Sequence, residues 1–188
     1  MKRTILIFGL ISGAISSLMM VSTIPFLHKL GTAKGAIVGY TAIVLSFMLV
    51  FFGIRSYREN VGNGEITFGR AFLVGIGITL ISCAFYVATW EIIYFKFMPD
   101  FMDNYGSHTI EKLRAAGATA EVIQAKINEF NQLKENYKNP LYNSALTFLE
   151  PFPVGLLITL TSAGILRNKR KVQIAAVPRQ NVAHLQNE

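Results

Sequence analysis

Four apolar segments, separated by shorter polar stretches, dominate the pattern along the chain. They cover about residues 4–27, 35–54, 69–97 and 141–166. A helix needs about 20 predominantly apolar residues to cross the hydrocarbon core of a bilayer, and each segment reaches that length. The pattern therefore predicts an all-α membrane protein with four transmembrane helices.

The stretch between the third and fourth segments, about residues 100–139, has the pattern of a helical hairpin. Four apolar side chains recur there at helical spacing: Ile123, Ile127, Phe130 and Tyr137. Gly117 is suited to end one helix and Thr119 to begin the next, while Asn139 and Pro140 form a typical helix start. We therefore expect an outward-facing hairpin, joined directly to the third and fourth membrane helices, with its four apolar side chains buried. Both a lid on the bundle and a binding surface for an envelope protein fit this hairpin.

Composition and charge also indicate a membrane protein and suggest its orientation. The 188 residues are 52% hydrophobic and only 15% charged, whereas soluble domains contain about 25% charged residues. The net charge of +7 comes largely from cations beside the apolar segments, which is the pattern of membrane topology and does not predict binding of nucleic acid. These cations are Lys2, Arg3, Arg55, Arg58, Arg70, Arg167, Lys169, Arg170, Lys171 and Arg179.

The other connections carry little net positive charge. The first connection holds only Lys29 and Lys34, and residues 96–140 contain six basic and six acidic side chains. Because short loops rich in Lys and Arg stay in the cytoplasm, we expect a multi-pass membrane protein with both termini cytoplasmic.

The chain is expected to form a single membrane domain, residues 1–171, followed by a mobile cytoplasmic tail, residues 172–188, that shows no periodicity. The first apolar segment is longer than the roughly 7–15-residue core of a signal peptide, so we expect it to be retained. Small residues at four-residue spacing, such as Gly9 and Gly13, are typical of close helix contacts. That spacing fits a bundle and a homo-oligomer equally well.

Two carboxylates lie inside the apolar segments and form the core of a candidate polar site. Glu91 lies about six residues inside the end of the third segment, and Glu150 about nine residues inside the start of the fourth. At a rise of about 1.5 Å per residue, these offsets predict one shared layer inside the bundle. The candidate site consists of these two residues and three partners: Glu91, Glu150, Tyr94, Thr147 and Lys96. Tyr86, His28 and Lys29 are further candidate partners.

Pro151 and Pro153 are expected to kink the fourth helix beside Glu150, because each proline removes a backbone donor and clashes with the preceding turn. A carboxylate beside freed carbonyl oxygens resembles the cation sites of transporters. Acids that are neutral or hydrogen-bonded can also hold helices together. Both hypotheses remain open at this point: structural acids, or a proton or cation site built from Glu91 and Glu150.

Motifs for catalysis, cofactors or metals do not emerge from the sequence. His28, His108 and His184 lie far apart, Cys83 is the single cysteine, and no GxxxxGK[ST] phosphate loop occurs. We therefore expect no catalytic residues, no metal, no cofactor and no enzymatic activity.

The order of these pieces resembles a bacterial four-helix membrane family, domain of unknown function 4199, found mostly in Bacteroidota. The matching stretches are ILIFGLISGAI, VFFGIRSYRE, GEITFGRAF, ATWEIIYF and NPLYNSALTFLEPFPVGLLITL. The likeness covers roughly residues 3–171 and implies a multi-pass inner-membrane protein without an assigned activity.

Taken together, the residues and the resemblance predict a non-enzymatic scaffold or accessory subunit. Its expected partners are the lipid bilayer and either further copies of the chain or another envelope protein. The alternative is a small proton- or cation-coupled transport component that uses Glu91 and Glu150.

Overall fold

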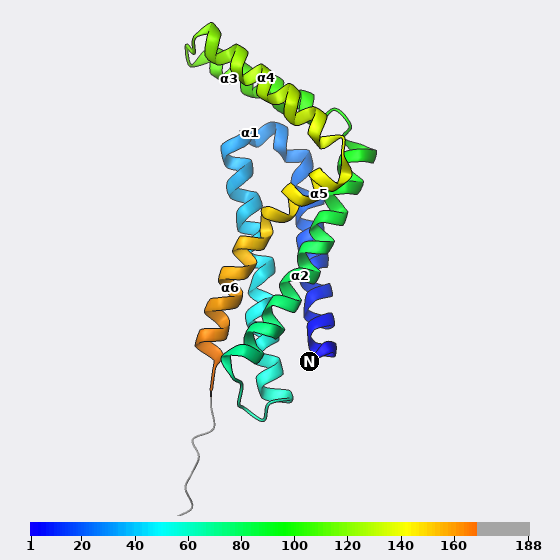
Figure 1. Ribbon diagram of the computed structural model, residues 1–188, viewed down its shortest axis with the longest axis vertical. Helices are drawn as coiled ribbons and strands as arrows, with labels where there is room; N and C mark the ends of the chain where they lie inside the picture. Colours follow the sequence, from blue (N-terminus) through cyan, green and yellow to red (C-terminus); the bar gives the residue numbers. More distant parts are fainter. Residues whose placement is uncertain (169–188) are drawn as a thin grey trace, which may run out of the picture.

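The computed structural model describes the backbone of residues 1–168 and the side chains of residues 1–23 and 37–168. The described chain is almost entirely helical (Figure 1). Its elements are α1 (Lys2–Asn60), α2 (Phe68–Ile92), the π-helical turn η1 (Ile93–Phe97), α3 (Phe101–Ala115), α4 (Ala120–Tyr137), α5 (Pro140–Leu149) and α6 (Pro151–Leu166). The predicted tail, residues 172–188, lies outside the described residues.

Four stretches of helix are long and apolar enough to cross a membrane, which confirms the predicted fold class. They are Lys2–Thr23, Ile37–Asn60, Phe68–Phe97 and Pro140–Leu166. The fourth span consists of α5 and α6, which are separated at Glu150. The helix is therefore interrupted directly before Pro151, beside the predicted kink.

The first two spans belong to one helix, α1, which folds back on itself (Figure 1). Two reciprocal hydrogen bonds join its halves, from Ser12 Oγ to the Ser46 carbonyl at 2.9 Å and from Ser46 Oγ to the Ser12 carbonyl at 2.7 Å. We predicted a separate connection between these spans, but helical backbone continues through the reversal. The second span also extends to Asn60, so Arg55 and Arg58 lie on the last turns of α1 and not in a loop.

Both halves of α1, together with α2 and α6, pack around an apolar core. Val50 and Ile54 of α1 and Val74 and Ile78 of α2 are completely buried. Figure 1 shows the N-terminus, the α1–α2 turn and the end of α6 at one end of the bundle, which we call the terminal end, and α3 and α4 at the opposite, hairpin end.

At the terminal end, a short antiparallel bridge fixes the α1–α2 turn. Ile66 N donates to the Asn168 carbonyl at 3.0 Å, and Asn168 N donates to the Ile66 carbonyl at 2.9 Å. Arg58 Nη1 also donates to the carbonyl of Leu166 at 3.4 Å. A cation suits this position because the carbonyls at a helix C-terminus carry partial negative charge. The last turn of α6 is thereby tied to the α1–α2 turn.

Glycines allow the helices to approach closely, as the four-residue spacing predicted. A Cβ atom added at Gly9 or Gly13 would lie 2.8 Å from the side chain of Ile81 or Phe85 of α2, respectively. A Cβ atom added at Gly75 of α2 would lie 2.7 Å from the side chain of Thr159 of α6. These contacts leave no room for a larger side chain, so the spans form a tight bundle.

The hairpin helices α3 and α4 pack against each other in the predicted order and with the predicted ends. Thr119 Oγ1 accepts from Val122 N at the start of α4, and Gly117 has a φ of 74° after the end of α3. Asn139 Oδ1 accepts from Leu141 N at the start of α5. The orientation of the hairpin relative to a bilayer remains a prediction.

The predicted burial of the hairpin stripe is wrong in degree. Its four members are half-buried, and none is fully buried: Ile123, Ile127, Phe130 and Tyr137. Phe130 packs on Tyr105 of α3 with ring centroids 5.7 Å apart. The periodicity correctly identified the inner face of α4, but two helices alone cannot surround a side chain as a bundle does.

We predict that Gly155→Ala in α6 destabilises the protein by about 1–3 kcal/mol, because the added methyl group would overpack the core. It would meet Phe47 Cζ at 2.9 Å as well as Thr79. Gly164→Ala on the same helix is the matched control, since no atom lies within 4 Å of the added group and alanine favours helix by up to about 1 kcal/mol. Thermal unfolding in mild detergent checks both variants. Equal unfolding temperatures for the two variants would contradict the close packing.

Candidate functional site

Consecutive residues of α2 and α5 form paired hydrogen bonds near the hairpin end of the bundle. Trp90 Nε1 donates to Asn143 Oδ1, and Ser144 Oγ donates to Glu91 Oε1, each at 3.0 Å. We call this group, with Thr147, the hairpin-end cluster. It fixes both the relative rotation and the register of the two helices that lead into and out of the hairpin.

Asn143 is the centre of the hairpin-end cluster. Its side chain is completely buried, and its Oδ1 also accepts from Thr147 Oγ1 at 3.1 Å. The amide Nδ2 is buried and has no hydrogen-bond partner among the described residues. A buried amide that accepts a hydrogen bond from another helix is a strong constraint, because a movement of α5 relative to α2 would leave Trp90 without an acceptor.

The sequence analysis did not identify Asn143, although a signal was present. Asn143 and Thr147 lie four residues apart within an apolar segment, with Ser144 beside them. Polar residues at this spacing share one helix face and bond to neighbouring helices in membranes.

Glu150 lies at the break between α5 and α6, and its side chain is exposed on the surface of the chain. Tyr86 of α2 donates to Glu150 Oε2 at 3.0 Å, as one of the predicted partners. Glu150 N still donates to the carbonyl of Thr147, at 3.4 Å. The helix break therefore exposes a carboxylate, although the backbone N–H of Glu150 still forms a hydrogen bond there.

The structure does not bring the two carboxylates to each other or to a shared partner. Tyr86, the partner of Glu150, precedes Glu91 by five residues on α2, and Ser144, the partner of Glu91, precedes Glu150 by six. At about 1.5 Å per residue, the two pairs lie in layers separated by roughly 7–9 Å. Counting residues from the ends of the segments missed this offset, because it ignored the tilt of α5 and the break after it.

The other predicted site residues have separate roles. Lys96 is exposed and forms no bond with either carboxylate. Tyr94 is buried among aromatic rings, and the Thr147 hydroxyl donates a hydrogen bond to Asn143 Oδ1. The side chains of His28 and Lys29 lie outside the described residues. Within the described part of the chain, no three His, Cys, Asp or Glu side chains are grouped so that they could hold a metal ion.

Aromatic rings connect the hairpin-end cluster to the hairpin. Trp90 contacts Phe101 edge-on at 5.0 Å, and Tyr94 contacts Tyr137 at 5.8 Å between ring centroids. Phe101 in turn stacks on Tyr105, which contacts Phe130. Such pairs each contribute about 0.5–1.5 kcal/mol beyond their buried area. The base of the hairpin, at Phe101 and Tyr137, is therefore packed against the end of the third span.

Electrostatic and burial effects add to this connection. Lys134 of α4 donates to Asp103 of α3, and this bond raises the pKa of the Lys134 ammonium, which keeps its charge at neutral pH. Burial raises the pKa of the Tyr137 hydroxyl, which stays protonated. The ion pair joins the two hairpin helices close to the bundle.

Elsewhere in the described spans, several hydroxyls form hydrogen bonds between helices. The hydroxyls of Thr79 and Thr159 lie 3.0 Å apart between α2 and α6. Thr89 donates to Ser17 Oγ at 2.7 Å between α2 and α1. These contacts join helices in pairs, as hydroxyl groups commonly do within membranes.

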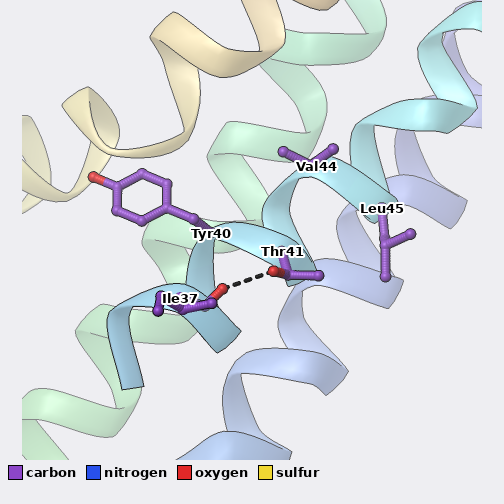
Figure 2. Close-up of a pocket in the computed structure, with 5 residues that line it drawn as sticks. All are labelled: Ile37, Tyr40, Thr41, Val44 and Leu45. Atoms are coloured by element: carbon purple, nitrogen blue, oxygen red, sulfur yellow. Dashed lines mark hydrogen bonds between the residues drawn. The ribbon is translucent and has the colours of Figure 1, made fainter. Parts of the chain in front are cut away.

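A shallow apolar groove of about 460 Å³ lies on the second half of α1 (Figure 2). Its lining residues are Ile37, Tyr40, Thr41, Val44 and Leu45. The Thr41 hydroxyl donates to the Ile37 carbonyl at 2.7 Å, so the groove offers few free polar groups. Such a surface suits lipid chains or an apolar helix better than a polar substrate.

A family model described as "Protein of unknown function (DUF4199)" matches residues 7–168. The chain belongs to this family. The match includes both carboxylates, the hairpin-end cluster and the hairpin. Comparisons with curated proteins and with solved structures gave no match. In this DUF4199 protein, the arrangement can fix helices and present a carboxylate at a helix break.

We predict that Asn143→Ala destabilises this DUF4199 protein by about 2–4 kcal/mol, because Trp90 Nε1 and Thr147 Oγ1 would both lose their buried acceptor. Trp90 is the single tryptophan, so its fluorescence emission should shift to shorter wavelength when the indole loses its hydrogen bond. Asn128→Ala, at an exposed position of α4, should change stability by less than about 0.5 kcal/mol. Unchanged emission in Asn143→Ala would contradict the assigned hydrogen bond.

Proposed function

We propose that this protein is a non-enzymatic scaffold or accessory subunit of the bacterial inner membrane. Its termini lie in the cytoplasm, and its hairpin faces outward and binds another envelope protein. The clusters of cations at the terminal end support this orientation, because cytoplasmic loops are enriched in Lys and Arg. The observation that most directly supports a scaffold is the packed joint between the hairpin and the bundle.

The joint leaves little freedom between the two parts. η1 continues the third span to Phe97, and only residues 98–100 separate it from α3. On the other side, Lys138 and Asn139 separate α4 from α5, and the Asn139 side chain caps α5. The aromatic contacts lie across this joint. A surface held in a fixed orientation is what a scaffold requires, since binding then orders few additional groups.

The interior favours the scaffold over proton- or cation-coupled transport. Close helix contacts at Gly9, Gly13 and Gly75 fill the bundle, and hydroxyl pairs such as Thr79 with Thr159 bond to each other between helices. Glu91 is held by Ser144 and Glu150 by Tyr86, in separate layers. Transport would require acidic groups along one continuous polar path.

We predict that envelope proteins co-purify with the wild type in mild detergent and are lost when residues 101–137 are replaced by a short Gly/Ser linker. Glu91→Gln is the matched control, because the amide oxygen still accepts from Ser144. It should retain both the partners and the fold. Thermal unfolding of the linker variant must show that the bundle remains intact.

Two results would contradict the proposed function. An unchanged set of co-purifying proteins without the hairpin would show that the hairpin is not the binding surface. Loss of a cellular activity in Glu91→Gln, with fold and partners retained, would instead support transport. The two outcomes separate a wrong surface from a wrong class of function.

A further inference from the structure

We propose that Glu150 is the contact point for a transmembrane helix of another membrane protein, and that this helix carries a lysine or arginine at the same depth. The inference rests on the proposed function and deepens it, since it states the chemistry of a partner inside the bilayer. It depends on the exposure of Glu150, on the distribution of cations and on the neighbouring groove.

Glu150 lies well inside the fourth apolar span. It follows Pro140, the start of its span, by ten residues and precedes the end at Leu166 by sixteen. The side chain is exposed, and so are the neighbouring side chains of Leu149 and Leu157, at 59% and 65%. Tyr86 covers Oε2, whereas Oε1 has no hydrogen-bond partner among the described residues. The carboxylate thus lies on a surface that is otherwise apolar.

An acid at this place is unstable against lipid alone. A charged side chain in the middle of a membrane helix is energetically costly, and such residues usually pair with another polar group. Glu91 satisfies this rule within the chain, because it is half-buried and Ser144 donates to it. Glu150 satisfies it only in part, through Tyr86.

The described spans contain no cation to complete the pair. Their basic residues all lie near the ends of the spans: Lys2, Arg3, Arg55, Arg58, Arg70 and Lys96. None of them bonds to Glu150. A second copy of the described spans would bring the same distribution, so we assign the complementary charge to a different protein.

The surface beside Glu150 fits a helix. The ring of Tyr40 points from α1 towards the neighbouring span that contains Glu150 (Figure 2). Tyr40 lines the apolar groove (Figure 2), so groove and carboxylate belong to one side of the bundle. An incoming helix would fill the groove with apolar side chains and place its basic group at Oε1. Tyr86 would hold the carboxylate in position.

A designed helix tests this inference without knowledge of the natural partner. The probe is a fluorescent Leu/Ala transmembrane peptide with one central lysine, and its matched control has leucine there. The full-length protein, labelled at Ala125→Cys in a Cys83→Ala background, is reconstituted in lipid vesicles, and energy transfer reports binding. We expect the lysine peptide to bind about tenfold more tightly than the leucine peptide.

In Glu150→Gln, the lysine and leucine peptides should bind with about equal affinity. This variant keeps the acceptor for Tyr86 but removes the charge. If Glu150→Gln folds poorly, the lysine preference is measured in Glu150→Ala instead. Glu91→Gln should retain the full preference, because that carboxylate is engaged by Ser144. This control separates the exposed carboxylate from intramembrane charge in general.

Three results would overturn the inference: equal binding of the two peptides, a lysine preference that survives in both Glu150 variants, or self-association of the wild type that Glu150→Gln abolishes. The third would assign the surface to a second copy of the chain. If the wild type shows no lysine preference but co-purification still depends on the hairpin, only this inference is refuted. If the wild type shows the lysine preference but co-purification does not depend on the hairpin, only the proposed function is refuted.

Discussion

Polar side chains of α2 and α5 pair at the hairpin end of the bundle and fix how these two helices meet. Asn143 accepts from Trp90 across the two helices, and Ser144 donates to Glu91 one residue further along each helix. Within a bilayer no water replaces a lost partner, so these bonds fix rotation and register together. Because α2 leads into the hairpin and α5 leads out of it, the same bonds determine where the hairpin lies. The aromatic contacts then extend this fixed geometry to α3 and α4.

The two intramembrane acids illustrate how environment separates similar residues. Glu91 is half-buried and has a donor on the neighbouring helix, so it acts as part of the helix contact. Glu150 is exposed at a helix break, where Tyr86 binds only one of its oxygens. The first carboxylate needs nothing from outside the chain, whereas the second favours an external partner. Scaffold function and a docking point within the membrane are therefore compatible in one small bundle.

Local and compositional features of the sequence predicted most of the fold. Span positions followed from hydropathy, and the helix ends at Thr119 and Asn139 followed from side chains that bond to their own backbone. The candidate site was less predictable, because contacts between helices depend on tilt and rotation that residue counting does not contain. Thus Tyr86 was correctly expected near an acid, but the layer offset of Glu91 and Glu150 and the central role of Asn143 were not.

The central claim is that the hairpin-end cluster holds the hairpin in one orientation. Spin labels at Ala125→Cys on α4 and Gly164→Cys on α6, in a Cys83→Ala background, measure the distance between hairpin and bundle by electron double resonance in lipid vesicles. Both positions are exposed, so the labels should not disturb packing. We predict one narrow distance distribution that broadens when Asn143→Ala is added. A broad distribution in the protein with an intact cluster would contradict the account.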